Sequence, residues 1–458
     1  MKIYVKDIIE KCKAKLICGN PNVECVNFSK DTRTICKNDV YVGIKGETFD
    51  GNSFYEQALE KGASVCILDN LDETNFDYEK YQDKTVVLVE DSVKCLQVLA
   101  GYKRSMYDIP VIAITGSVGK TSTKDMVASV LSKKYKVLKT EGNYNNHIGL
   151  PLTILKLKDH NCLVVEMGMN HLGEISLLTN IAKPNVAIIT NVGTAHIGIL
   201  GSRENILKAK LEILEGLCED KVVIINNDND MLHSVKSKLD GIYKVITIGM
   251  DTASDYKASN VEINENDTIF NIDNAKIKLN ISSTPFVYNS LVAFAVGKYY
   301  QIEEEKIIEA ISNFELSKNR LSKLVNKNKV TIIDDTYNAS YDSMKASIEL
   351  LSRTSGNKKV ALLGDMLELG SFSEKIHRNI GKVVVDNSID VLITVGIYSK
   401  YIDEEAIKLG FNKDNIYHFD KENDTYKLLD EILNENDVIL LKASHGIGLA
   451  NVVNYLMK

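Results

Sequence analysis

A glycine-rich stretch at residues 115–121 (TGSVGKT) lies between a predicted apolar strand and a predicted helix. In such a loop, backbone N–H groups and the amino end of the helix face a phosphate, while a lysine adds positive charge and a hydroxyl reaches Mg²⁺. Ile114 replaces the first glycine of the longer G-x-x-x-x-G-K-[ST] pattern. A plain turn would need several coincidences, so we expect this loop to bind a nucleoside triphosphate. The residues expected to hold it are Gly116, Ser117, Gly119, Lys120, Thr121 and Ser122.

Three polar side chains follow later strands of the same segment, where ligands of open α/β sheets gather. Glu166 ends an apolar run, and beside Thr121 it would give Mg²⁺ two oxygen ligands, although a solvated strand end is the alternative. His196 lies in the loop after the next strand, a place that a histidine without a special role also occupies. Lys210 is rarely neutral at pH 7, so it would steady phosphates as a cation or bind metal after carbamylation by CO₂. The residue pattern alone leaves both roles of Lys210 open.

Two further stretches are candidates for substrate contacts. Residues 140–151 form a long polar run rich in amides and glycines, which indicates either a substrate surface or a capped turn before a helix. Asp31 and Arg33 form either an ordinary surface pair or part of a sugar-phosphate site with the loop that begins at Lys45. The side chains singled out in these stretches are Asp31, Arg33, Lys45, Asn145 and Asn146.

Composition excludes several classes of protein. The formal net charge is -7, and no basic stripe interleaved with aromatic residues is present, which argues against a nucleic-acid partner. No apolar run approaches the length of a membrane span, and the first residues lack a signal-peptide pattern, so we expect a cytoplasmic protein without a membrane span. The eight cysteines include no C-x-x-C pair and are expected to be reduced. We expect a monomer.

The length of 458 residues suits about three domains. We predict domains at 1–108, 109–315 and 316–458, with a hinge near 316–321. Strands alternate with helices in the central segment, as in a parallel α/β sheet, and period-two alternation over 258–281 predicts antiparallel strands added to it. A third α/β unit follows, again with polar strand ends at 334–338, 364–365 and 442–446. Central strands are predicted at 111–115, 162–166, 186–191, 221–226 and 244–248, and helices at 120–134, 172–182, 203–216 and 229–238.

These motifs resemble the Mur ligase family over the whole chain, and specifically its D-alanyl-D-alanine-adding branch. Residues 115–124 are similar to the short phosphate loop of that family, and residues 364–370 (GDMLELG) to the most branch-specific signature. Other stretches that carry the resemblance are 31–33, 45–54, 143–151, 166–175, 191–212 and 335–344.

The resemblance implies three α/β domains: a UDP-sugar-binding domain, a central P-loop ATPase domain and a Rossmann-like domain. It further implies that ATP and Mg²⁺ are used to join UDP-N-acetylmuramoyl-tripeptide to D-alanyl-D-alanine in peptidoglycan precursor synthesis. Thr121 and Glu166 would hold one Mg²⁺, and His196 and Lys210, a lysine typically carbamylated in this family, would serve a second. Lys120 would grip the β- and γ-phosphates. The resemblance places Asn289, Arg320, Asp335 and Asn338 in the nucleotide site, and Asp31, Arg33, Lys45, Asn145 and Asn146 against the substrate.

Some positions depart from the family pattern: His147, Ser340-Tyr341, His445 and residues 283–286. They leave open a paralogue of this branch with a different amine substrate. A ligase that adds the third amino acid of the peptide shares the N-terminal motifs, but residues 364–370 argue against it. A folylpolyglutamate synthetase would lack the domain before the phosphate loop. A non-catalytic nucleotide switch would not need Glu166, His196 and Lys210 together. The third residue of the acceptor peptide is not readable from the sequence.

Overall fold

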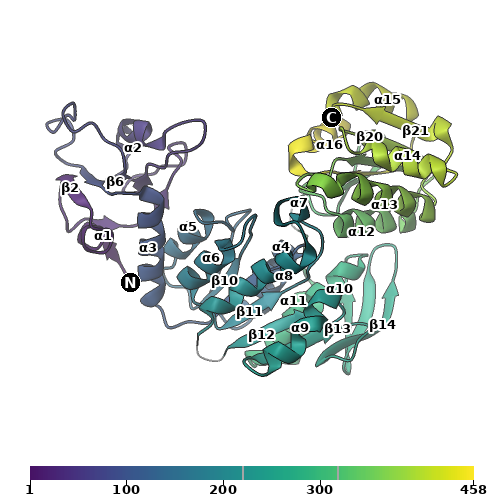
Figure 1. The fold of residues 1–458 in the computed structure, drawn as a ribbon, viewed down its shortest axis with the longest axis horizontal. Helices are drawn as coiled ribbons and strands as arrows, with labels where there is room; N and C mark the ends of the chain where they lie inside the picture. The colour runs from purple at the N-terminus through teal and green to yellow at the C-terminus, as the bar shows by residue number, and fades with distance from the viewer. Residues whose placement is uncertain (219–220, 317–318) are drawn as a thin grey trace. The chain divides into compact units, whose positions relative to one another are not determined.

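The computed structural model describes residues 1–218, 221–316 and 319–458 (Figure 1). Residues 317 and 318 of the predicted hinge lie outside the described residues, and the domain limits at 108 and 315 stay predictions. The chain divides into two compact units. The first consists of 1–115, 134–187 and 211–222, and the second of 116–133, 188–210 and 223–458.

The first unit begins with a five-stranded sheet of order β2-β7-β6-β5-β4. Its central strands are parallel, and β2 runs antiparallel to β7 at one edge. The inner strand β6 (Val65–Leu68) is buried at every residue, because apolar side chains are covered on both faces of the sheet. The other strands of this sheet are β2 (Lys15–Cys18), β4 (Phe28–Ser29), β5 (Val40–Val42) and β7 (Thr85–Leu88). A separate antiparallel pair consists of β1 (Ile3–Tyr4) and β3 (Glu24–Cys25).

Helix α3 (Ser92–Ser105) connects this sheet to the phosphate-loop strand. It begins where the Asp91 side chain accepts a hydrogen bond from Lys94 N. Near its end, the buried Arg104 donates to the carbonyl of Ala182 at 2.8 Å and to that of Tyr107 at 2.5 Å. This guanidinium therefore fixes the segment that leads into strand β8 (Val111–Thr115). The other helices before it are α1 (Val5–Cys12), the 3₁₀ turn η1 (Gly51–Phe54) and α2 (Tyr55–Glu60).

The largest sheet has nine strands in the order β16-β15-β14-β13-β12-β11-β8-β10-β9. β8, β10 and β9 are parallel, and β8 and β10 are buried at every residue. β14, β15 and β16 are antiparallel to one another, as the period-two alternation predicted. The strands are β8 (Val111–Thr115), β9 (Val137–Lys139), β10 (Cys162–Glu166), β11 (Val186–Ile189), β12 (Val222–Asn226), β13 (Lys244–Gly249), β14 (Tyr256–Ile263), β15 (Thr268–Ile272) and β16 (Ala275–Leu279).

Helices α4 (Lys120–Leu131) and α10 (Thr284–Tyr299) pack closely in the second unit. A Cβ on Gly297 would lie 2.8 Å from Val130 Cγ1, so glycine at this position permits the close helix contact. The predicted helix at 203–216 divides into α8 (Arg203–Leu211) and the 3₁₀ turn η2 (Glu212–Gly216). The remaining helices of the segment are α5 (Gly149–Leu155), α6 (Glu174–Ala182), α7 (Ile197–Leu200), α9 (Asp230–Asp240) and α11 (Glu304–Ser312).

The third sheet has the order β17-β18-β22-β19-β20-β21 and is parallel except for the edge strand β17. Apolar side chains of α15 and α16 pack on one face, and α12, α13 and α14 lie on the other (Figure 1). This arrangement confirms the predicted α/β class. The elements are β17 (Ser322–Val325), β18 (Thr331–Asp334), α12 (Tyr341–Arg353), β19 (Lys359–Gly364), η3 (Gly370–Phe372), α13 (Ser373–Asp386), β20 (Val391–Val395), α14 (Lys400–Lys408), η4 (Lys413–Asn415), β21 (Ile416–Phe419), η5 (Glu422–Thr425), α15 (Tyr426–Ile432), β22 (Val438–Lys442), η6 (His445–Ile447) and α16 (Ala450–Leu456).

No helix within the described ranges is long and apolar enough to cross a membrane.

Candidate active site

The phosphate loop is shaped by the segment that follows β11. A Cβ on Gly116 would lie 1.8 Å from Thr190 Oγ1, so a larger residue would not fit there. The Oδ1 atom of Asn191 accepts hydrogen bonds from two successive loop N–H groups, those of Ser117 at 3.0 Å and Val118 at 2.9 Å. Asn191 therefore satisfies two N–H groups of the predicted loop and holds the turn in shape, and phosphate binding by the loop stays a prediction.

The start of α4 brings the loop lysine and threonine together with an arginine from the C-terminal part of the chain. Gly119 precedes the helix with a left-handed φ of 82°, a conformation that favours glycine. Lys120 Nζ donates to the Gly116 carbonyl at 2.8 Å. Arg320 Nη2 donates to Thr121 Oγ1 at 2.9 Å. Ser117, Thr121 and Ser122 are buried, with 8%, 8% and 7% of each residue exposed.

Asn289 of α10 also lies at this helix, as predicted for the nucleotide site. Its Oδ1 accepts a hydrogen bond from Thr123 Oγ1 at 3.0 Å, and 5% of the residue is exposed. The same oxygen lies 3.3 Å from the position that a Cβ on Gly119 would take. Asn289 therefore contacts the first turn of α4 through Thr123 and lies next to Gly119 of the loop.

The segment that carries Arg320 has an unusual backbone. The residues on both sides of it, Asn319 and Leu321, have left-handed φ values of 61° and 51°, which cost energy in residues other than glycine. Tyr337 N donates to the Asn319 carbonyl at 3.2 Å, and the Arg320 guanidinium lies 4.0 Å from the centre of the Tyr337 ring. These contacts hold the strained segment and direct Arg320 toward the phosphate loop.

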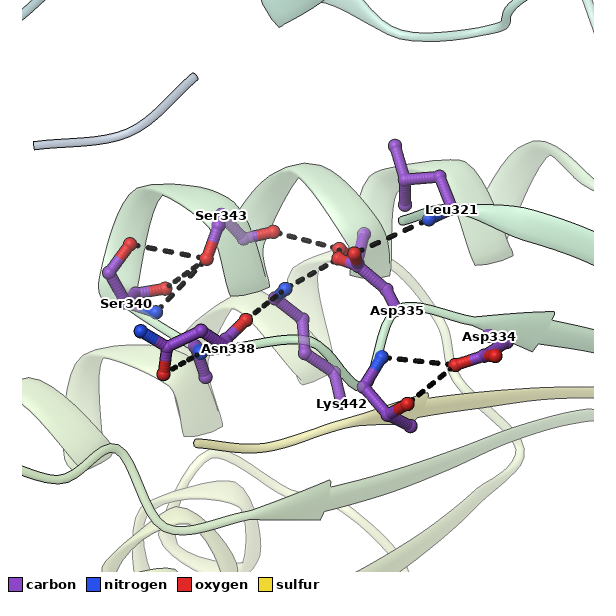
Figure 2. A network of polar contacts seen from close by, with 10 residues as sticks. Leu321, Asp334, Asp335, Asn338, Ser340, Ser343 and Lys442 are labelled. Carbon is purple, nitrogen blue, oxygen red and sulfur yellow. Dashed lines mark hydrogen bonds and ion pairs between the residues drawn. The ribbon is translucent and has the colours of Figure 1, made fainter. Parts of the chain in front are cut away.

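Figure 2 shows the polar network that anchors this segment at the carboxyl ends of β18 and β22. Asp335 accepts hydrogen bonds from Lys442 Nζ at 2.5 Å, Ser347 Oγ at 2.7 Å and Leu321 N at 3.3 Å. Lys442 is 1% exposed and also donates to the Asn338 carbonyl at 3.0 Å. The Asn338 side chain accepts from Ala339 N. The predicted residues Asp335 and Asn338 are thus brought together by a buried lysine.

Lys442 was not among the residues predicted to have a role. The signal that could have found it is a lysine at the end of the apolar run Val438–Lys442, since a charge placed there must be paired once the strand is buried.

In the first unit, Glu166 at the end of β10 is buried, with 2% of the residue exposed. Asn145 Nδ2 donates to Glu166 Oε1 at 2.8 Å and so orients the carboxylate. Asn146 has a different position, because its Oδ1 accepts from the N–H groups of Ile148 and Gly149 at the start of α5. The capped turn is therefore present at Asn146, Asn145 contacts the candidate site residue Glu166, and a substrate surface at this loop stays a prediction.

His196 precedes α7 with a left-handed φ of 63°. Its Nδ1 lies 2.6 Å from Glu368 Oε2, and this histidine lowers the pKa of the Glu368 carboxyl. Glu368 belongs to the 364–370 stretch, and no individual role was predicted for its side chain.

Lys210 of α8 is a buried lysine near a second cation, Lys120. Only 1% of the residue is exposed, and burial together with the charge of Lys120 lowers the pKa of its ammonium well below the usual value. No carboxylate contributes to this shift, so Lys210 has a larger neutral fraction than an ordinary surface lysine.

The residues predicted near the uridine lie on the surface of the first unit. Asp31 and Arg33 pair with each other at 2.7 Å, and the guanidinium lowers the pKa of Asp31 to about 2. Lys45 is exposed, and its backbone forms an isolated bridge with Asp50. The ordinary surface pair is thus present, and a role in substrate binding stays a prediction.

Comparison with known proteins identifies the family. The family model "Mur ligase middle domain" matches residues 114–297, and "Mur ligase, glutamate ligase domain" matches residues 319–445. The chain is 38% identical to the UDP-N-acetylmuramoyl-tripeptide--D-alanyl-D-alanine ligase of Bacillus subtilis, with 100% of this chain and 99% of the relative covered.

Solved structures agree. A crystal structure of MurF from Acinetobacter baumannii has a TM-score of 0.89 and 27% identity, with 100% of this chain and 99% of that chain covered. The MurF ligase from Thermotoga maritima in complex with ADP has a TM-score of 0.80 and 29% identity, with 94% and 97% covered. The match extends over the phosphate loop, the polar strand ends, and the nine-stranded and six-stranded sheets. This chain therefore belongs to the Mur ligase family, in its MurF branch.

Proposed function

We propose that this chain joins D-alanyl-D-alanine to UDP-N-acetylmuramoyl-tripeptide with ATP hydrolysed to ADP and phosphate, in peptidoglycan precursor synthesis. The observation that carries the proposal is 38% identity over the full chain to a ligase of that name. The phosphate loop and the buried residues Glu166 and Lys210 supply the chemistry that such a reaction needs.

A free carboxylate does not acylate an amine, because the oxide or hydroxide that would have to leave the carboxyl carbon is a poor leaving group. The tripeptide carboxylate would therefore attack the γ-phosphate of ATP and form an acyl phosphate. The dipeptide amine would then attack that carbonyl, and phosphate would leave from a tetrahedral intermediate. Alignment of the reactants contributes roughly 7–11 kcal/mol to such reactions. The chain would supply this alignment and neutralise the phosphate charge, with Lys120 at the β- and γ-phosphates.

The residues present fit a requirement for Mg²⁺. Glu166 is a buried carboxylate oriented by Asn145, and Thr121 carries a hydroxyl at the start of α4. Both are hard oxygen ligands of the kind that Mg²⁺ uses beside phosphate oxygens. Thr121 and Glu166 would hold one ion, and His196 and Lys210 would serve a second. When bound, Mg²⁺ draws negative charge from the phosphate oxygens.

Carbamylation of Lys210 is consistent with its environment. Only a neutral amine adds to CO₂, and the pKa of Lys210 is lowered well below its usual value by burial and by Lys120. The ammonium would first lose one proton, and a second proton would leave when the neutral amine adds to CO₂, so that a buried cation becomes an anion near the Lys120 cation. That anion would be able to ligate a metal, which an ammonium cannot do.

The remaining predicted residues divide by their contacts. Arg320 already contacts Thr121, and Asn289 supports the same helix, which favours direct roles at the nucleotide. Asp335 and Asn338 would act through the network around Lys442, which holds the Arg320 segment in place. Asp31, Arg33 and Lys45 would contact the UDP moiety. Asn145 and Asn146 would contact the acceptor substrate from the polar loop at 140–151.

The test is phosphate release from ATP and Mg²⁺ with UDP-N-acetylmuramoyl-tripeptide, in the presence and absence of D-alanyl-D-alanine. Release that requires both substrates, with the pentapeptide product identified by mass, is the expected result. Acceptors that end in diaminopimelate or in lysine are compared in parallel. Release with another amine instead would identify a paralogue, whose specificity would then be traced to the departures at His147 and His445.

A further inference from the structure

Two cysteine sulfurs meet in the first unit, between α1 and α3. Cys12 is the last residue of α1, and Cys95 lies in the first half of α3. The Cys95 Sγ lies 2.8 Å from the Cys12 Sγ. This separation is roughly 0.8 Å longer than the S–S bond of about 2.04 Å. Both thiols are free, so the two helices hold an unbonded pair of sulfurs within reach of a bond.

The two helices are fixed to each other by contacts that do not involve the sulfurs. Tyr102 of α3 donates through its hydroxyl to Asp7 of α1 at 3.5 Å, and the Lys11 ammonium lies 5.2 Å from the centre of the Tyr102 ring. Lys103 Nζ donates to the Met1 carbonyl at 2.6 Å. These contacts hold α1 and α3 together independently of the cysteines, so the two sulfurs already face each other before any bond forms.

The two thiols are not equivalent. Cys12 is half-buried and so open to a small solute, whereas 3% of Cys95 is exposed. The Cys95 thiol donates toward the Cys12 sulfur, and this hydrogen bond lowers the pKa of Cys12 while burial and the same contact raise that of Cys95. A thiolate is the form that reacts with oxidants. Cys12 therefore has the properties of the thiol that reacts first with an oxidant, and Cys95 has those of the thiol that then forms the disulfide.

We propose that Cys12 and Cys95 are a site of oxidative modification that closes to an intramolecular disulfide in the presence of a peroxide. The Cys12 thiolate attacks one peroxide oxygen, the O–O bond breaks, and Cys12 becomes a sulfenic acid while water or an alcohol leaves. The Cys95 sulfur then attacks the Cys12 sulfur, its proton is released, and the sulfenic hydroxyl leaves as water. Two thiols are oxidised by two electrons in total and one peroxide is reduced. A dithiol reductant reverses the change.

The disulfide would join positions separated by 83 residues. It would therefore restrict the unfolded chain more than a disulfide that closes a short loop does. The expected consequence is a first unit that resists unfolding better when oxidised. This inference does not depend on the proposed ligase activity.

The experiment uses the full chain, first reduced and then exposed to a small excess of hydrogen peroxide before alkylation. Before alkylation the mass should be 2 Da lower than that of the reduced chain, and of the eight cysteines two are then expected to escape the alkylating agent. A non-reducing peptide map should contain a fragment that joins Cys12 to Cys95. The urea midpoint should rise on oxidation and fall again after treatment with dithiothreitol.

Three variants sharpen the test. Cys12→Ser should lose both the disulfide and the rise in midpoint. Cys95→Ala should retain a sulfenic acid at Cys12 that a dimedone probe traps, since no resolving thiol remains. Cys36→Ser, which removes an exposed cysteine elsewhere in the unit, should behave like the unchanged chain. Eight alkylated cysteines after peroxide, a disulfide between other positions, or sulfinic acid at Cys12 with Cys95 present would overturn the proposal.

Discussion

His196 Nδ1 lies 2.6 Å from Glu368 Oε2, and a second contact joins the same two segments, because Gly198 N donates to the Glu368 carbonyl at 3.0 Å. A Cβ on Gly198 would lie 2.4 Å from Gly370 N, so this approach requires glycine. A carboxylate on one ring nitrogen fixes the tautomer of a histidine and leaves the other nitrogen to a metal. Glu368 therefore has the position of a residue that orients His196.

The first prediction concerns this orientation. Glu368→Gln is expected to weaken metal binding in the presence of ADP by roughly 10–100-fold, the range typical of such supporting carboxylates. Electron paramagnetic resonance of bound Mn²⁺ measures the affinity directly, and it remains interpretable even without ligase turnover. Glu374→Gln, which removes an exposed carboxylate paired with Arg378, is the control and should leave Mn²⁺ affinity unchanged. Equal affinities in both variants would show that Glu368 does not act on His196.

Lys210 gives a second prediction. Lys210→Ala should reduce kcat strongly, and added short carboxylates should restore part of it, because they replace the missing carbamate anion. Turnover with and without acetate or formate measures this effect. Lys120→Ala removes the phosphate-binding cation and is expected to abolish turnover without rescue. Full activity of Lys210→Ala without any carboxylate would remove Lys210 from the mechanism.

Removal of one partner of the buried ion pair between Lys442 and Asp335 is expected to lower the free energy of unfolding substantially. Lys442→Met leaves the Asp335 carboxylate buried without its cation, and loss of one partner of a buried pair costs about 3–5 kcal/mol. Urea unfolding measures the free energy, with Lys427→Met as the control, since that exposed pair should contribute under about 1 kcal/mol. Similar losses in the two variants would contradict the importance of the network. The affinity for ADP should also fall, because Asp335 anchors the segment of Arg320.

Substitutions of the adjacent residues Asn145 and Asn146 are expected to change different quantities. Asn145→Ala removes the donor to Glu166 and is expected to raise the Mg²⁺ concentration needed for half-maximal turnover, with little change in stability. Asn146→Ala removes the cap of α5 and should lower the free energy of unfolding by about 1 kcal/mol. Thermal unfolding and a Mg²⁺ titration of both variants separate the two effects. The assignment is wrong if the variants change the same quantity.

The last prediction concerns pH. Burial raises the pKa of Asp403 to about 7, and its Oδ2 lies 3.4 Å from His418 Nδ1. A carboxyl whose pKa is raised in the fold favours the folded state most at low pH, and this contribution is lost as pH rises from about 4 toward 7. Compared with Asp403→Asn, the unchanged chain should gain about 1.4 kcal/mol of stability between pH 8 and pH 6. Urea midpoints at several pH values measure the difference, and parallel curves would refute it.

Much of the architecture was readable from local pattern. Strands such as β8 and β10 stand out because parallel strands covered on both faces need continuous apolar runs. The antiparallel strands over 258–281 followed from alternation. β9 and β17 were missed, since three or four residues give too short a pattern to separate from a loop. The end of the helix predicted at 203–216 was also misplaced, because a 3₁₀ turn continues the same apolar spacing.

By itself, the sequence determined the phosphate loop, the α/β class and the polar strand ends, because each depends on residues close together along the chain. Only the tertiary structure decided which of those polar groups meet. Asp335 and Lys442 are 107 residues apart, and Thr121 and Arg320 are 199 apart, so neither pair leaves a local signal. The burial that lowers the pKa of Lys210 is likewise set by the surrounding fold. Pairing and desolvation depend on distance in space, which residue types and their spacing do not specify.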